Sequence, residues 1–164
     1  MKAQDIIAAV ITKVKEELQK HNDPLNQPLS SDHAETVVNA ILNAVLVAGA
    51  EGFKTYLAQN EIHENTIVHE GEKYQFNCTS KKEFQTPLGK TVVQRRLYQN
   101  KNGDSFIPLD HAWNMEHQFA TPEVREAVLY AVSLMPAKEA HQLFGQCSSF
   151  NLAEGVEAGG YFFP

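Results

Sequence analysis

Hydrophobic positions over the first sixty residues recur with the period of an α-helix. Residues 3–21 place their large apolar side chains on one face, with lysines and glutamates elsewhere. A second apolar stripe follows over residues 37–59. We therefore expect an antiparallel helical pair over residues 1–60. Such a pair most often packs as core, but two helices bury little by themselves, so it is also a candidate dimerisation surface. The apolar positions of the first helix are Ile7, Val10, Ile11, Val14 and Leu18.

The boundaries of the second helix are marked by polar residues and glycines. Asp32 followed by Glu35 matches a capping box, which predicts that the helix begins there. Gly49 and Gly52 weaken its middle, because glycine is a poor helix former. They predict either a close helix crossing or a break.

Between residues 61 and 109 the pattern changes to the alternation of β-strands. β-branched and aromatic residues alternate with polar ones, and Asn102-Gly103 is a strong hairpin signal. We therefore expect a small antiparallel β-sheet of three or four strands. The expected strands cover residues 73–78, 84–86, 91–98 and 105–107, with turns at 87–89 and 100–104.

Residues 110–150 return to a helical pattern. Thr121-Pro122-Glu123 predicts a helix start, and Pro136 ends that helix before a short one over residues 137–144. This arrangement is the first part of a helix-turn-helix, although a plain helical hairpin fits the pattern equally well. Residues 151–164 read as an irregular tail. The fold class is therefore α+β, with an N-terminal helical pair, a small sheet and a C-terminal helical hairpin.

Length and composition favour a soluble domain. The chain has 164 residues, 43% of them hydrophobic, which suffices for a core and excludes a fully disordered chain. No uninterrupted apolar run approaches the ~18–20 residues of a membrane span, and no signal-peptide pattern opens the chain. We therefore expect a cytoplasmic protein without a membrane partner, in which Cys78 and Cys147 are free thiols.

The net charge of −6 conceals an uneven distribution. Residues 80–101 carry six basic side chains and one acidic one, Glu83, whereas the rest of the chain carries eight basic and 19 acidic. A locally basic element can bind an anion despite an acidic total, because salt screens distant charges beyond ~8 Å. The alternative is an ordinary solvated hairpin. The candidate DNA-binding residues are Lys81, Lys82, Lys90, Arg95, Arg96 and Lys101, although strand alternation places Arg95 on the Val93/Leu97 face, where it is a candidate structural residue.

No residue pattern predicts catalysis, a metal or a cofactor. The histidines and cysteines lack metal-ligand spacing, and nucleotide-binding and nucleophile motifs do not occur. Asp110 and Glu116 are a conceivable carboxylate pair for metal-assisted phosphodiester chemistry. Helix capping by Asp110 is the better interpretation. We therefore expect no catalytic residues, no metal site and no small-molecule ligand.

The order of several short motifs resembles a known family. The matching residues are Thr86, Pro87, Gly89, Arg95, Tyr98, Pro108, Leu109, Asp110, Ala120, Thr121 and Pro122. In this order and spacing they resemble the N-terminal region of bacterial insertion-sequence transposases of the ISKra type, a DDE family. The resemblance covers roughly residues 73–150, about half the chain. Many relatives carry a Cys-x-x-Cys knuckle where this chain has Asn100-Lys101-Asn102-Gly103, so a zinc-ribbon role does not carry over.

The resemblance implies a DNA-binding and assembly role. Members of the family continue through a helix-turn-helix into an RNase H-like domain with three catalytic carboxylates, whereas the similarity here fades near Phe150. We therefore expect a truncated transposase fragment that binds DNA and has no strand-transfer activity of its own. The alternative is a stand-alone protein-interaction module that forms a homodimer through its N-terminal helices. A third class, a small hydrolase using Asp110 and His111, would need activity that Asp110→Asn abolishes.

Overall fold

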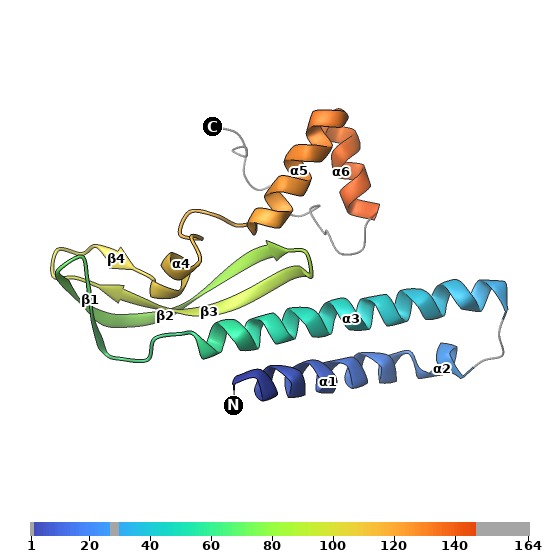
Figure 1. The fold of residues 1–164 in the computed structure, drawn as a ribbon, viewed down its shortest axis with the longest axis horizontal. Helices are drawn as coiled ribbons and strands as arrows, with labels where there is room; N and C mark the ends of the chain where they lie inside the picture. Colours follow the sequence, from blue (N-terminus) through green and yellow to red (C-terminus); the bar gives the residue numbers. More distant parts are fainter. Residues whose placement is uncertain (1, 27–29, 147–164) are drawn as a thin grey trace.

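Helices precede and follow one antiparallel sheet along the chain in the computed structural model, which describes residues 2–26 and 30–146 (Figure 1). The expected α+β class is confirmed. The elements are α1 Lys2–Lys20, α2 Asn22–Leu25, α3 Ser31–Gln59, β1 Thr66–His69, β2 Glu72–Thr86, β3 Gly89–Gln99, β4 Ser105–Phe106, α4 Pro108–Ala112, α5 Pro122–Leu134 and α6 Ala137–Gln146.

The two long N-terminal helices pack side by side and antiparallel (Figure 1). Small residues of α3 allow this close approach: a Cβ atom built on Gly52 would lie 2.5 Å from a methyl group of Val10. The helix continues through both glycines, so neither marks a break; Gly52 marks the close approach of α1, whereas Gly49 lies against Leu88 of the β2–β3 turn. It begins one residue after Ser30, whose side chain accepts a hydrogen bond from the His33 N–H. The predicted cap at Asp32 is therefore wrong, because the helix begins before Asp32 and Ser30 caps its first turn.

The sheet is antiparallel, with strand order β1-β2-β3-β4. A long ladder joins β2 to β3 from the turn at Thr86 and Gly89 down to Gln75 and Gln99, with a bulge near Phe76. The two short strands expected at 73–78 and 84–86 are one continuous strand, β2.

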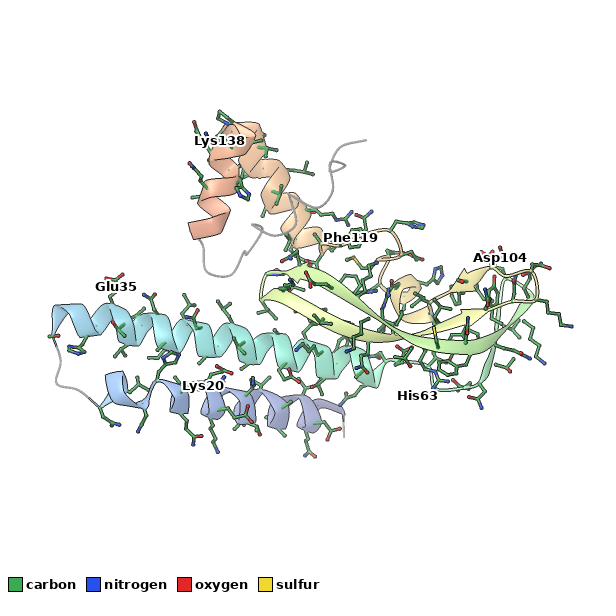
Figure 2. All side chains as sticks on the ribbon, turned by 180° about the vertical axis from the view of Figure 1, so that it is seen from behind. Lys20, Glu35, His63, Asp104, Phe119 and Lys138 are labelled. Carbon is green, nitrogen blue, oxygen red and sulfur yellow. The ribbon has the colours of Figure 1, made fainter. Side chains whose placement is uncertain are left out.

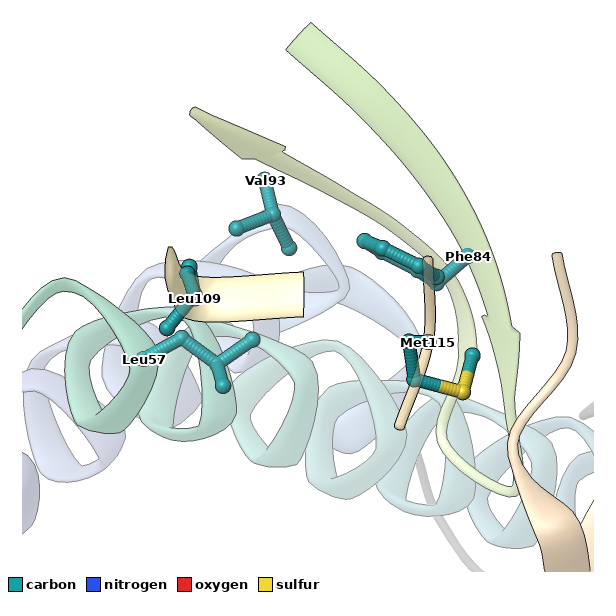
Figure 3. Close-up of a cluster of buried hydrophobic side chains, with 5 residues drawn as sticks. All are labelled: Leu57, Phe84, Val93, Leu109 and Met115. Carbon is teal, nitrogen blue, oxygen red and sulfur yellow. The ribbon is translucent and has the colours of Figure 1, made fainter. Parts of the chain in front are cut away.

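The hydrophobic core lies where α3, the β2–β3 ladder and α4 meet. Trp113 and Phe53 pack against the buried cluster, and their rings are 5.5 Å apart. Figure 3 shows the five buried members, which come from α3, β2, β3, α4 and the segment after α4: Leu57, Phe84, Val93, Leu109 and Met115. A second buried cluster, around Ala131 and Ala140, lies within α5 and α6.

The C-terminal helices join the sheet through a short extended segment. Gln85 N–H donates to the Phe119 carbonyl at 2.7 Å, and Thr121 N–H donates to the Gln85 carbonyl at 2.9 Å. Thr121 and Pro122 open α5 as expected, and α6 runs on to Gln146. The third segment of a helix-turn-helix, Cys147 and the expected tail at 151–164 lie outside the described residues. Cys78 is an exposed free thiol.

One described helix meets the length and composition criteria for crossing a membrane. It covers residues 33–59, with a mean hydropathy of 1.5 in its most apolar window, of which 28% is buried. Buried core helices of soluble proteins also pass this test of length and composition.

Candidate nucleic-acid interface

The β2–β3 ladder has two chemically different faces, because successive side chains of a strand point to opposite sides. The packed face, which contains Lys82, Phe84, Val93 and Arg95, lies against α3 and α4 and the segment that follows them. The opposite side, which we name the open face, is mostly exposed. The open face consists of Thr79, Lys81, Glu83, Gln85, Lys90, Val92, Gln94 and Arg96.

Two of the six candidate DNA-binding residues lie inside the protein. Arg95 is 7% exposed and pairs through Nη1 with Asp110 Oδ2, while its Nη2 donates to Ser80 Oγ at 3.0 Å. Lys82 Nζ lies 3.3 Å from the same carboxylate oxygen and donates to the Met115 carbonyl at 2.6 Å. Both cations are therefore used in an internal network, and neither presents its charge on the surface. The suspicion that Arg95 faces inward is confirmed, whereas the surface placement of Lys82 is wrong.

Asp110 serves this network and does not cap a helix. The N-cap of α4 is Ile107, and Asp110 lies in the first turn with only 2% of its surface exposed. Glu116, its companion in the alternative carboxylate pair, instead lies with Oε1 2.7 Å from His111 Nδ1, within hydrogen-bond distance. The structure thus separates the two carboxylates by function: one neutralises buried cations, and the other binds a surface histidine.

Arg96 is held at the end of the open face by aromatic rings. Its guanidinium carbon lies 3.9 Å from the ring centre of Phe76 and 5.8 Å from that of Tyr98. Its backbone N–H donates to Glu61 Oε2 at 3.2 Å, and burial raises the pKa of that carboxyl. Stacking on rings leaves the edge of a guanidinium able to donate hydrogen bonds.

The three remaining candidates lie at the surface but in different surroundings. Lys81 is exposed in the middle of the open face. Lys90 pairs with Glu83 at 3.0 Å on the same face. Lys101 belongs to the β3–β4 turn, at the other end of β3 from Lys90, next to the acidic Asp104. The structure therefore brings Lys81, Lys90 and Arg96 together on one face and leaves Lys101 apart.

The motifs that carry the family resemblance perform structural work here. Thr86 Oγ1 accepts from Leu88 N–H and donates to the Gly89 carbonyl, which closes the β2–β3 turn. The Tyr98 hydroxyl lies within 3.0 Å of the carbonyl oxygens of Ile62 and Glu64, and so fixes the connection between α3 and β1. Together with the Arg95–Asp110 pair, these contacts give the matching residues structural roles in this chain.

Comparisons with known proteins add no further assignment. Within residues 2–26 and 30–146, no three His, Cys, Asp or Glu side chains come together as metal ligands would. No family model, curated protein or solved structure matches this chain. The relationship to insertion-sequence transposases therefore stays an expectation drawn from the sequence.

Proposed function

We propose that this chain is a cytoplasmic DNA-binding and assembly module, in which the open face of the β2–β3 ladder contacts the phosphate backbone. The observation that carries this proposal is the presence of Lys81, Lys90 and Arg96 on one exposed face of a two-stranded ribbon. Lysine and arginine contacts to phosphate give affinity without sequence preference. The module is assigned no strand-transfer chemistry of its own.

Carboxylates limit the strength of this interface. Glu83 neutralises Lys90, and Glu61 lies beside the backbone of Arg96. Each phosphate contact contributes a salt dependence of about −0.9 in the slope of log K against log salt for duplex DNA, so the two contacts from Lys81 and Arg96 give a slope of about −2. We therefore expect weak binding at low salt that is lost at moderate salt.

Fluorescence anisotropy with a labelled random-sequence duplex tests the proposal over a salt series. Lys81→Ala should weaken binding and reduce the salt slope by about one, because it removes one phosphate contact. Glu83→Gln should strengthen binding, since it removes a negative charge and releases Lys90 for a phosphate. The two opposite changes on one face distinguish a phosphate interface from general loss of folding.

The matched control is Lys138→Ala, which removes an exposed lysine from α6, away from the open face. Its binding should equal that of the unaltered chain. Equal weakening by Lys138→Ala and Lys81→Ala, or no salt-dependent binding by the unaltered protein, would refute an interface on the open face.

A further inference from the structure

Large apolar side chains line one side of the α1–α3 pair without being covered. Seven of them, each between 44% and 61% exposed, form what we name the helical apolar face. Figure 2 shows side chains projecting into solvent along the whole length of the two helices. The members are Ile7 and Ile11 on α1, and Val38, Ile41, Leu42, Val45 and Tyr56 on α3.

The other side of the helical pair is polar. Lys13 of α1 lines a groove with Asn43, Val47 and Lys54 of α3, so these four residues share one side of the pair, where Leu88 and Lys90 of the β2–β3 turn line the same groove. Lys13 also pairs with Glu17 at 3.2 Å. A charged side of this kind is typical of a solvent-facing helix surface.

Helical geometry places the apolar residues on the side opposite Lys13. Val10 of α1 contacts Gly52 of α3, which fixes the line along which the helices meet. At about 100° per residue, Ile11 and Lys13 fall on opposite sides of that line. On α3, Val45 and Val47 likewise fall on opposite sides of Ala44, which is buried between the helices. The apolar stripes of the two helices therefore adjoin and form one surface.

This surface has the size of a stable interface. Half-exposure of seven large side chains leaves on the order of 700 Å² uncovered, close to the ~800 Å² that each partner contributes to a standard interface. The largest apolar patch on a typical monomer is ~300–600 Å². The area is therefore sufficient for a partner.

The spacing of the apolar residues fits a helical partner. On α1, Ile7, Ile11, Val14 and Leu18 follow each other at intervals of four, three and four residues, which is the spacing of a coiled-coil seam. A helix that lies on a lipid surface carries an excess of lysines and arginines beside its apolar stripe, whereas α1 and α3 together carry five lysines and six carboxylates, and the net charge of −6 disfavours anionic lipids. A second copy of this chain would supply two helices with the same apolar seam.

We propose that the helical apolar face binds the same face of a second copy, so that two α1–α3 pairs form a four-helix interface. A two-fold dimer of this kind uses one self-complementary surface on both subunits. The polar side with Lys13 and the open face of the sheet remain exposed to solvent. This interaction goes beyond phosphate binding and does not depend on it.

Sedimentation velocity of the full chain over a concentration series tests the dimer. The unaltered protein should sediment with the mass of two chains, and Val45→Glu should shift it to the mass of one, because a charge would be buried at the centre of the interface. Val47→Glu is the matched control: it introduces the same charge on the same helix, at a residue 41% exposed on the polar side. This control should remain dimeric.

Ile11→Gln provides a second, milder variant on α1, and circular dichroism establishes that each variant is folded. Dissociation by Ile11→Gln with retained helicity would support the dimer even if Val45→Glu failed to fold. A monomeric unaltered protein at every concentration, or equal effects of Val45→Glu and Val47→Glu, would overturn the proposal. So would a monomer that co-sediments with neutral phosphatidylcholine vesicles, since lipid would then be the occupant.

Discussion

A single buried carboxylate holds two buried cations in this protein. Asp110 pairs with Arg95 and Lys82, which leaves an excess positive charge in the interior. Lys82 offsets this excess through its other contacts, since Nζ lies 4.8 Å from the centre of the Phe84 ring and donates to the Met115 carbonyl. Removing one member of a buried ion pair is costly because its partner is left uncompensated.

We therefore predict that Asp110→Asn destabilises the fold by about 3–5 kcal/mol, which is the usual cost of breaking a buried ion pair. Equilibrium denaturation in urea measures this loss. Glu83→Gln breaks the exposed pair with Lys90 and should change stability by less than about 1 kcal/mol. Comparable losses in both variants would show that the Asp110 network contributes no more than a surface pair.

At the scale of single residues, the sequence predicted which face of a strand a side chain lies on better than it predicted which residue that side chain contacts. Strand alternation indicated that Arg95 faces inward, and the same argument applied to Lys82, two residues before the buried Phe84, would have moved it from the surface. The partner was not predictable, because Asp110 reaches Arg95 only after the β3–β4 turn and α4 are in place. A polar residue after a Pro-Leu dipeptide equally fits a helix cap.

At the scale of elements, the contact between α1 and α3 depends on Gly52. An alanine Cβ there would lie 2.5 Å from Val10, closer than real Cβ atoms approach. Alanine normally favours a helix over glycine by about 1 kcal/mol, whereas overpacking costs about 1–3 kcal/mol. We predict that the destabilisation from the clash with Val10 exceeds the gain in helix propensity.

Gly52→Ala should therefore lower the thermal midpoint of unfolding, and the double variant with Val10→Ala should recover part of the loss. Differential scanning calorimetry measures both midpoints. Ala58→Gly serves as a control, because it introduces the opposite change at an exposed position in the last turn of the same helix and should cost less than the interior propensity difference of about 1 kcal/mol. An increase in stability for Gly52→Ala would contradict the close approach of the helices.

Helices were easier to predict than strands in this chain. Apolar periodicity located α1, α3 and α5, since a helix is stabilised by contacts within its own segment. The polar run over residues 79–83 concealed the middle of β2, which is a strand because β3 pairs with it throughout. Likewise Ile67 and Val68 are too short a signal for β1, whose pairing with β2 forms the edge of the sheet.

At the scale of the whole molecule, two separate clusters stabilise the fold. One unites Phe53, Phe84 and Trp113 around the sheet, and the other holds α5 against α6 around Ala140. The sequence predicted the order of helical pair, sheet and helical hairpin, but not which elements share a core. Contacts such as that between Leu57 and Leu109 join segments about fifty residues apart, and no local pattern encodes them.

The two clusters should unfold as separate units, because they share no residue and the backbone bonds of Gln85 with Phe119 and Thr121 are among the few contacts that join α5 to the sheet. Trp113 is the protein's one tryptophan, so its fluorescence reports the first cluster alone, whereas circular dichroism reports all helices. Ala140→Asp buries a charge between α5 and α6, where the alanine is 2% exposed. For this variant we predict an early loss of part of the helical signal on heating, with an unchanged midpoint for the Trp113 fluorescence.

Ala137→Asp adds the same charge at the exposed N-terminus of α6, where an acidic residue is favourable, and should leave both signals unaltered. A shift of the Trp113 midpoint by Ala140→Asp would instead show that the described fold unfolds as one cooperative unit.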